Sequence, residues 1–232
     1  MKQLITLTLL PLLTLGSAQA ALYDRGGGLI YDDVLNVIWL QDANANGVMT
    51  WADANAWAGN LTVGNTRTWT EASVWRLPSV GPINDTTFNY MASSAGDTDI
   101  GYNISASGTT YAGSTQSEMA YMFYNNLDGV GAEDTAGDSV SPYGLLSGTG
   151  PFTNLETSNY WSDQPQSFFN AMFFNFATGE QNVAITTNKL FAWAVRDGDV
   201  NDISAVPVPG AVWLFGSGLL GLLAFRRRQR SS

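Results

Sequence analysis

The segment from Asp42 to Asp53 carries oxygen-bearing side chains at the spacing of a calcium-binding loop. Counted from Asp42, these side chains fall at positions 1, 3, 5, 9 and 12, and a glycine stands at position 6. Carboxylate, amide and hydroxyl oxygens at such positions can wrap one calcium ion. We therefore expect calcium as the one candidate cofactor, with five ligands: Asp42, Asn44, Asn46, Thr50 and Asp53.

The same residues also fit a purely structural interpretation. The last position of a calcium loop is normally a glutamate, and Asp53 is shorter. No amphipathic helix precedes the loop. In the alternative, the residues from Asp42 to Asn46 form Asx turns, and Asp53 completes the N-terminal cap of a helix that begins after Thr50. Both interpretations stay open.

Other chemistry is restricted by composition. The chain has no cysteine and no histidine, which excludes thiol catalysis, Ser-His-Asp catalysis and histidine-based metal sites. The acid pairs Asp97/Asp99 and Asp197/Asp199 could serve glycoside hydrolysis. They stand at loop or chain-end positions, where acids are usually solvated, whereas a catalytic acid needs buried surroundings. We expect no enzyme, and the alternative is a carboxylate-dependent glycan-acting enzyme.

The segment between the two chain ends is strongly acidic. Of the 10 Lys and Arg residues, five lie in residues 21–204, together with all 20 acidic residues, which gives this segment a formal charge of −15. Such a charge repels nucleic acid, so no nucleic-acid partner is expected. The two arginines Arg76 and Arg196 are rare cations here, and we expect them to pair with carboxylates.

The first 20 residues have the pattern of a secretory signal peptide. Lys2 is followed by an apolar stretch from Leu4 to Leu15 and then by the small residues Ala18 and Ala20, which signal peptidase requires. We expect cleavage after Ala20 and export of the mature chain.

Residues 205–232 have the pattern of a membrane anchor. No charged residue lies between Asp202 and Arg226. Prolines at 207 and 209 restrict the predicted transmembrane helix to about residues 210–225, which is about 24 Å long against a hydrocarbon core of about 30 Å. A basic end at 226–230 follows, which prefers the cytoplasmic side; it contains Arg226, Arg227, Arg228 and Arg230. We therefore expect anchoring in the inner membrane, with residues 21–204 in the periplasm.

This tail resembles the PEP-CTERM sorting tail of Gram-negative bacteria that produce exopolysaccharide. The resemblance rests on the proline motif, the glycine-bearing apolar helix and the terminal arginines. The residues of the motif are Val206, Pro207 and Pro209, with Val208 where a glutamate is usual. The resemblance implies a sorting protease of the exosortase type as a partner, and release to the cell surface or the extracellular matrix.

Short elements are expected to position the first half of residues 21–204. Two strands within residues 29–40 meet at a turn at Asp32–Asp33. The helix after Thr50 turns Ala54, Trp57, Ala58 and Leu61 toward the core. A short helix is expected over 88–93, and a long surface loop over 96–113.

The second half is expected to contain one helix and several strands. A capping box formed by Thr115 and Glu118 opens a helix through Leu127. Its inward side chains are Met119, Met122, Phe123 and Leu127. A loop over 128–150 and strands at 160–162, 171–176, 183–185 and 191–196 complete an α+β domain.

Four ordered segments resemble the domain named for the Lcl C-terminal region of bacterial surface proteins. They are Ile38–Asn44, Met49–Ala54, Trp75–Pro78, and Tyr160–Ser162 paired with Ala192–Asp199. The resemblance implies a C-type-lectin-like and formylglycine-generating-enzyme-like fold with a twisted antiparallel sheet. It also implies a binding or structural module associated with extracellular polysaccharide. The tryptophans of these motifs are expected in the core, at 39, 75, 161 and 193, and Trp69 is the candidate for exposure.

Overall fold

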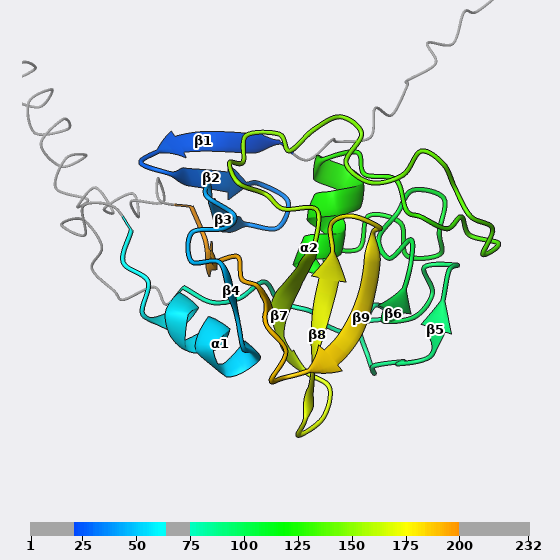
Figure 1. The fold of residues 1–232 in the computed structure, drawn as a ribbon. Helices are drawn as coiled ribbons and strands as arrows, with labels where there is room; N and C mark the ends of the chain where they lie inside the picture. The colour runs from blue at the N-terminus through cyan, green and yellow to red at the C-terminus, as the bar shows by residue number, and fades with distance from the viewer. Residues whose placement is uncertain (1–20, 64–74, 200–232) are drawn as a thin grey trace, which may run out of the picture.

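The computed structural model describes residues 21–63 and 75–199, and this part of the chain is mostly β with two short helices (Figure 1). The strands form a four-stranded antiparallel sheet and a seven-stranded mixed sheet. The predictions for the signal peptide, for Trp69 and for the tail lie outside the described residues. None of the helices in the described part has the length and apolarity that a bilayer crossing requires.

The four-stranded sheet brings the two ends of the described chain together. Its order is β1-β2-β3-β11, so the last strand pairs with one of the first three. The bounds are β1 (Leu22–Gly26), β2 (Leu29–Asp32), β3 (Val37–Leu40) and β11 (Val195–Asp197). The turn predicted at Asp32–Asp33 is confirmed, since β2 and β3 are antiparallel neighbours.

The seven-stranded sheet is built around the antiparallel strands β7, β8 and β9. Its order is β4-β10-β7-β8-β9-β6-β5, with parallel pairing between β10 and β7 and between β5 and β6. The bounds are β4 (Val48–Met49), β5 (Ala92–Ser93), β6 (Ile100–Gly101), β7 (Asn159–Pro165), β8 (Asn170–Asn175), β9 (Glu180–Ile185) and β10 (Leu190–Phe191).

Three fully buried tryptophans tie the early segments of the chain to the late ones. The rings of Trp39 and Trp193 lie 4.5 Å apart between centroids. Their indole contacts also cross the fold: Nε1 of Trp193 donates to the Leu40 carbonyl at 2.6 Å, and Nε1 of Trp161 donates to the Met49 carbonyl at 2.9 Å. The predicted core positions 39, 75, 161 and 193 are all buried. Large aromatic surfaces removed from water supply much of the stability of a domain without disulfides.

The helix α1 (Trp51–Gly59) begins where the sequence predicts. Thr50 is its N-cap, and the Thr50 hydroxyl accepts a hydrogen bond from the Asp53 amide. Ala54 and Ala58 are buried, and Trp57 packs beside the core. Two apolar residues one turn apart are enough to fix the buried face of so short a helix.

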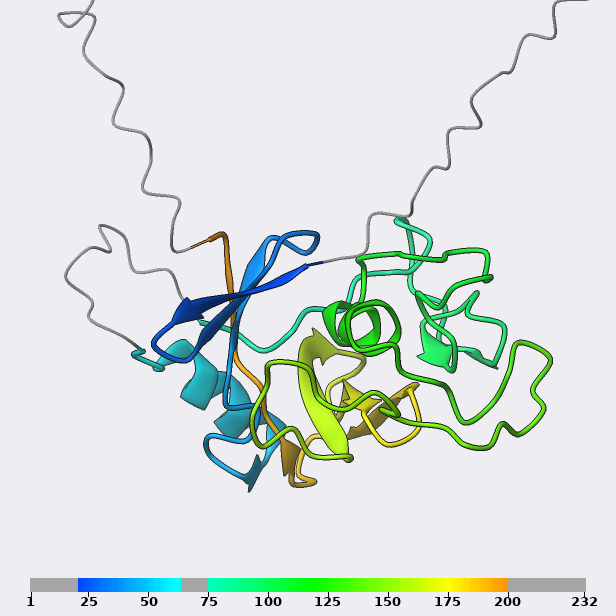
Figure 2. The same cartoon turned by 90° about the horizontal axis from the view of Figure 1, so that it is seen from above.

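The second helix begins later than predicted. Helix α2 (Glu118–Tyr121) has Ser117 as its N-cap, so the predicted capping box at Thr115 is wrong. It continues as a π-helical segment, η2 (Met122–Asn126), to the predicted end at Leu127. All four predicted inward residues are buried. In Figure 2 this helix is seen end-on between the blue strands β1 and β2 and the green loops.

Three further predictions from the sequence are wrong in part. Residues 88–93 form an extended stretch that ends in β5 and contain no helix. The segment 96–113 is irregular as expected, but it contains β6 and buries Ile100 and Ile104. The strand predicted over 191–196 is interrupted, because residues 192–194 leave one sheet and enter the other. The α+β expectation also understates the strands, since β1 to β4 all precede the first helix.

Candidate functional site

The first half of the predicted calcium loop is held by a second segment of the chain. The carboxylate of Asp42 accepts hydrogen bonds from the Asn44 amide at 3.0 Å and from the side chain of Asn154 at 3.1 Å. The side-chain amide of Asn44 in turn donates to Glu156 at 3.1 Å. The bond within the loop is that of an Asx turn. Asn46 is exposed.

The second half of the predicted loop forms the cap of α1. The Thr50 hydroxyl donates to the Asp53 carboxylate at 2.7 Å and accepts from the Asp53 amide at 3.3 Å. These bonds are those of the structural alternative that the sequence left open. The described residues contain no cluster of three or more acidic side chains that could hold a metal ion. Calcium binding by the five residues stays a prediction.

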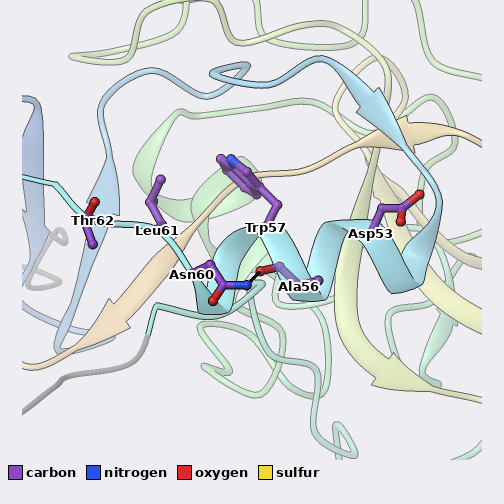
Figure 3. Close-up of a pocket in the computed structure, with 6 residues that line it drawn as sticks. All are labelled: Asp53, Ala56, Trp57, Asn60, Leu61 and Thr62. Carbon is purple, nitrogen blue, oxygen red and sulfur yellow. Dashed lines mark hydrogen bonds between the residues drawn. The ribbon is translucent and has the colours of Figure 1, made fainter.

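A shallow hollow of about 490 Å³ lies along α1 (Figure 3). Trp57 and Leu61 lie on one side of it, and the Asn60 side chain donates to the Ala56 carbonyl at 2.7 Å. Asp53 is the single titratable side chain in its lining, which consists of Asp53, Ala56, Trp57, Asn60, Leu61 and Thr62. Among the described residues, this lining offers surface for contact and one group, Asp53, for acid–base chemistry.

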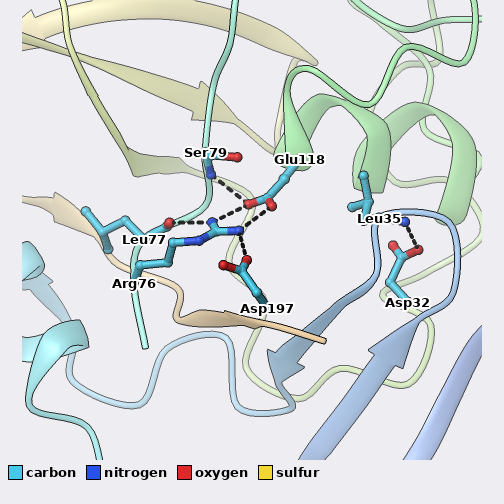
Figure 4. A network of polar contacts seen from close by, with 7 residues as sticks. All are labelled: Asp32, Leu35, Arg76, Leu77, Ser79, Glu118 and Asp197. Carbon is cyan, nitrogen blue, oxygen red and sulfur yellow. Dashed lines mark hydrogen bonds and ion pairs between the residues drawn. The ribbon is translucent and has the colours of Figure 1, made fainter. Parts of the chain in front are cut away.

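A charged network joins the segment after residue 75 to α2 and β11 (Figure 4). The guanidinium of Arg76 contacts the carboxylates of Glu118, at 2.7 Å, and of Asp197, at 2.5 Å. Glu118 also accepts a hydrogen bond from the Ser79 amide at 2.7 Å. Burial lowers the pKa of Arg76, but the hydrogen bonds and charges of the two carboxylates outweigh it and raise the pKa. The prediction that this arginine pairs with carboxylates is confirmed.

Two further charged side chains lie close to this network. Burial raises the pKa of Asp163 to about 6, the charge of Arg76 opposes the rise, and Glu118 adds to it. Arg196 is buried, and burial lowers its pKa while the charges of Asp197 and Asp199 counteract that effect. The network therefore stabilises the junction of three segments, and its residues do not belong to the lining of the hollow along α1.

The two acid pairs proposed for glycoside chemistry are dispersed among structural contacts. Asp99 is buried and accepts hydrogen bonds from the Ile83 and Asn89 amides, both at 2.6 Å. The expectation of a solvated Asp99 is therefore wrong. Asp97 accepts a hydrogen bond from a nearby serine hydroxyl at 2.6 Å. The carboxylate of Asp199 accepts a hydrogen bond from Nε of Arg25 at 2.9 Å. None of these four acids lines the hollow along α1. The expectation that the protein is not an enzyme and the alternative of a glycan-acting enzyme both stay predictions.

A further buried acid, Asp32, is likewise structural. Asp32 accepts a hydrogen bond from the Leu35 amide at 3.0 Å (Figure 4). It also accepts hydrogen bonds from the Val34 amide at 3.0 Å and from the side chain of Asn126 at 2.6 Å. Burial raises its pKa, and these donors oppose the rise. Asp32 thus connects the β2–β3 turn to η2.

Sequence reasoning missed an exposed aromatic pair at the tip of the β7–β8 hairpin. Phe168 is 90% exposed and Phe169 is 67% exposed, although both belong to a residue type that is usually buried. The signal in the sequence was two adjacent phenylalanines inside a turn of polar residues, where no core position is expected.

Comparison with known proteins identifies the tail. Residues 205–228 match a family model described as the PEP-CTERM protein-sorting motif. The match contains Val206, Pro207 and Pro209 and runs into the arginine cluster, so the predicted sorting tail is confirmed. Proteins with this motif are exported and sorted to the surface by an exosortase. No curated protein and no solved structure matches the chain significantly.

Proposed function

We propose that this protein is a non-catalytic binding or structural module that associates with extracellular polysaccharide after export. The observation that carries the proposal is the sorting motif at residues 205–228, which begins soon after the last described residue, Asp199. In this account residues 1–20 are removed on export. The tail then holds the domain at the inner membrane until an exosortase cuts it and releases the domain to the surface or matrix.

The described domain has features that suit such a role. Among the described acids, Glu118 binds an arginine, Asp99 accepts a backbone amide hydrogen bond and Asp53 accepts a hydrogen bond from the Thr50 hydroxyl at the cap of α1, so these three side chains stabilise the fold. Its net negative charge keeps it soluble and separated from anionic lipid and nucleic acid. A rigid domain with exposed loops is a suitable scaffold for polymer binding.

We also propose that residues 21–204 adopt a C-type-lectin-like arrangement. Support comes from the way in which the segments of the Lcl resemblance meet. Arg76 forms a bridge with Val195 of the segment Ala192–Asp199, and Trp39 from another segment contacts Trp193 of the same Ala192–Asp199. Long irregular segments and an antiparallel β7-β8-β9 unit also fit. A crystal structure with a strand order unlike that of C-type lectins would contradict this part of the proposal.

The test of function uses producing cells and their native matrix. We expect wild-type protein to fractionate with the matrix, and we expect a variant that lacks residues 205–232 to accumulate in the soluble periplasmic fraction and not in the membrane fraction or the matrix. Purified wild-type protein should sediment with native exopolysaccharide, whereas an unrelated exported acidic protein should not. If the wild-type protein fails to co-sediment with native exopolysaccharide at every ionic strength tested, the binding role is contradicted.

A further inference from the structure

The tip of the β7–β8 hairpin is the most exposed apolar surface of the described residues. In Figure 1 it projects below β7 and β8, beyond the other elements of the described chain. The rings of Phe168 and Phe169 pack edge to face, with centroids 4.8 Å apart, and Ile185 beside them is 56% exposed. Clustered exposed apolar side chains on a soluble domain mark sites of interaction.

The tip is held in place by hydrogen bonds. The Gln166 and Ser167 amides donate to the Asn170 carbonyl, at 2.9 and 3.1 Å. The Thr186 amide donates to the Phe169 carbonyl at 2.9 Å, which ties the hairpin to the end of β9. A binding surface that is already ordered loses little conformational entropy when a ligand arrives. The backbone that carries Phe168 and Phe169 is therefore ordered before a ligand binds.

The tip is an uncharged region on an acidic protein. No Asp, Glu, Lys or Arg lies in residues 164–170 or in residues 183–188. The polar side chains of these stretches are amides and hydroxyls, which are Gln164, Gln166, Ser167, Asn170, Thr186, Thr187 and Asn188. Flat apolar rings surrounded by neutral hydrogen-bonding groups complement a sugar ring, which has an apolar C–H face and hydroxyls at its edge.

The position of the tip disfavours the membrane as its partner. The described chain ends at Asp199, directly after β11 in the four-stranded sheet, and the sorting motif begins at residue 205. The predicted transmembrane helix begins at about residue 210, and the ten residues between Asp199 and that helix reach at most about 35 Å. The end of the described chain is therefore held within that distance of the membrane before processing, while the β7–β8 hairpin projects at the bottom of Figure 1, away from the orange end of the described chain.

We propose that Phe168 and Phe169 form the contact site for an uncharged segment of polysaccharide, an inference that rests on the proposed function and deepens it. A second copy of the chain fits less well, since three exposed apolar side chains fall far short of the roughly 1,200 Å² that a stable protein interface buries. Anionic polymers are repelled by the acidic domain. A single hairpin tip binds a polysaccharide weakly. When many copies of the protein contact the same matrix, the overall avidity rises because the binding events are linked.

The test measures binding of the exported full chain in nanodiscs of zwitterionic lipid. Biolayer interferometry uses three probes: galactomannan, hydroxyethylcellulose and the anionic polymer alginate. The double variant Phe168→Ser/Phe169→Ser should lose at least about tenfold in affinity for the neutral polymer that the wild type binds best. Phe168→Tyr/Phe169→Tyr should stay within about threefold of wild type, because it keeps the aromatic faces. The matched control Met91→Ser/Leu146→Ser removes apolar groups that are 72% and 53% exposed elsewhere, and it should bind like wild type.

The outcomes separate this inference from the proposed function. If wild type binds native matrix or a neutral probe and the Phe-to-Ser variant binds equally well, the tip is not the site and the proposed function survives. If wild type binds neither the probes nor native matrix, both fail. A preference for alginate, a flotation with empty liposomes that depends on the two phenylalanines, or a self-association that they alone support would each overturn the assignment. Equal melting temperatures for all variants establish that each remains folded.

Discussion

The guanidinium of Arg76 meets the carboxylate of Glu118 in a two-pronged contact, with Nη1–Oε2 at 2.8 Å and Nη2–Oε1 at 2.7 Å. The two residues are 42 positions apart, and the contact joins the segment before Ser79 to the first turn of α2. Such paired contacts combine charge with fixed geometry. The position of α2 against the sheet therefore depends on a residue that belongs to neither element.

Removal of the arginine should destabilise the domain. In Arg76→Met the Glu118 carboxylate, which is only 6% exposed in its side chain, loses its cation and stays buried. Breaking a buried pair costs about 3–5 kcal/mol, and we expect about 2–4 kcal/mol because the arginine is partly exposed. Urea unfolding measures the loss. The control Lys189→Met removes an exposed cation and should change the free energy of unfolding by less than about 0.5 kcal/mol. Equal stability of the two variants would contradict the role of the network.

Asp163 should make the stability of the domain depend on pH. Its folded pKa of about 6 is above its ordinary value, so the folded state binds more protons than the unfolded state between about pH 4 and pH 6. The contribution of this carboxyl is therefore present below about pH 4 and is lost as the pH rises through about 6.

The variant Asp163→Asn tests this dependence. At pH 8 the wild type keeps an ionised carboxylate half-buried, and a rise of about two pKa units corresponds to roughly 2–3 kcal/mol at most. We expect Asp163→Asn to be more stable than wild type by about 1–2 kcal/mol at pH 8 and nearly equal to it at pH 4. A stability difference that is the same at both values would disprove the assignment. Asp138→Asn on an exposed loop serves as the control.

Two glycines that both have a positive φ should respond differently to alanine. Gly101 has φ +120° in β6, and a Cβ there would lie 1.9 Å from the backbone oxygen of Ser93. Gly108 has φ +85° and open space around it. Gly108→Ala should cost about 1 kcal/mol from its backbone conformation alone. Gly101→Ala adds the steric conflict with β5 and should cost at least about 2 kcal/mol more. Similar unfolding midpoints in urea would show that the β5–β6 contact does not matter.

The calcium hypothesis has its own measurement. If the residues from Asp42 to Asp53 bind the ion, titration of the wild type with calcium should release or absorb heat, and millimolar calcium should raise the melting temperature. Asp42→Asn should abolish both effects, and Asp138→Asn should preserve them. With no heat and no melting shift at millimolar calcium, the Asx turn and the helix cap are the whole role of these residues.

The elements that the sequence predicts well are those specified by neighbouring residues. The hairpin within 29–40 follows from apolar and β-branched residues on either side of a turn, and α1 follows from the Thr50 cap with Ala54 and Ala58 on one face. Both need only contacts within a few positions. The buried tryptophans were likewise predictable, because large aromatic residues are the main source of core in a chain without cysteine.

The elements that the sequence predicts poorly depend on distant partners. Glu118 has the spacing of a capping box with Thr115, but its carboxylate binds Arg76, and Ser117 caps the helix instead. The Gly-rich segment 96–113 has the composition of a surface loop. Within it, however, the buried Asp99 accepts hydrogen bonds from the backbone amides of residues 83 and 89, which fix this part of the segment in the interior. These contacts join residues that are far apart in the sequence, so no local sequence pattern predicts them. The exposed Phe168 was missed for the opposite reason, since an aromatic residue is ordinarily assigned to the core.

Intact-mass spectrometry of the protein purified from producing cells tests the central claim most directly. In this account both ends of the chain are removed, and the mass reports where each end is cut. We predict a mature chain that begins at Ala21 and ends near Val206 to Pro209, with the full tail retained only when the exosortase is absent. A chain from producing cells that still begins at Met1 and ends at Ser232 would contradict the account.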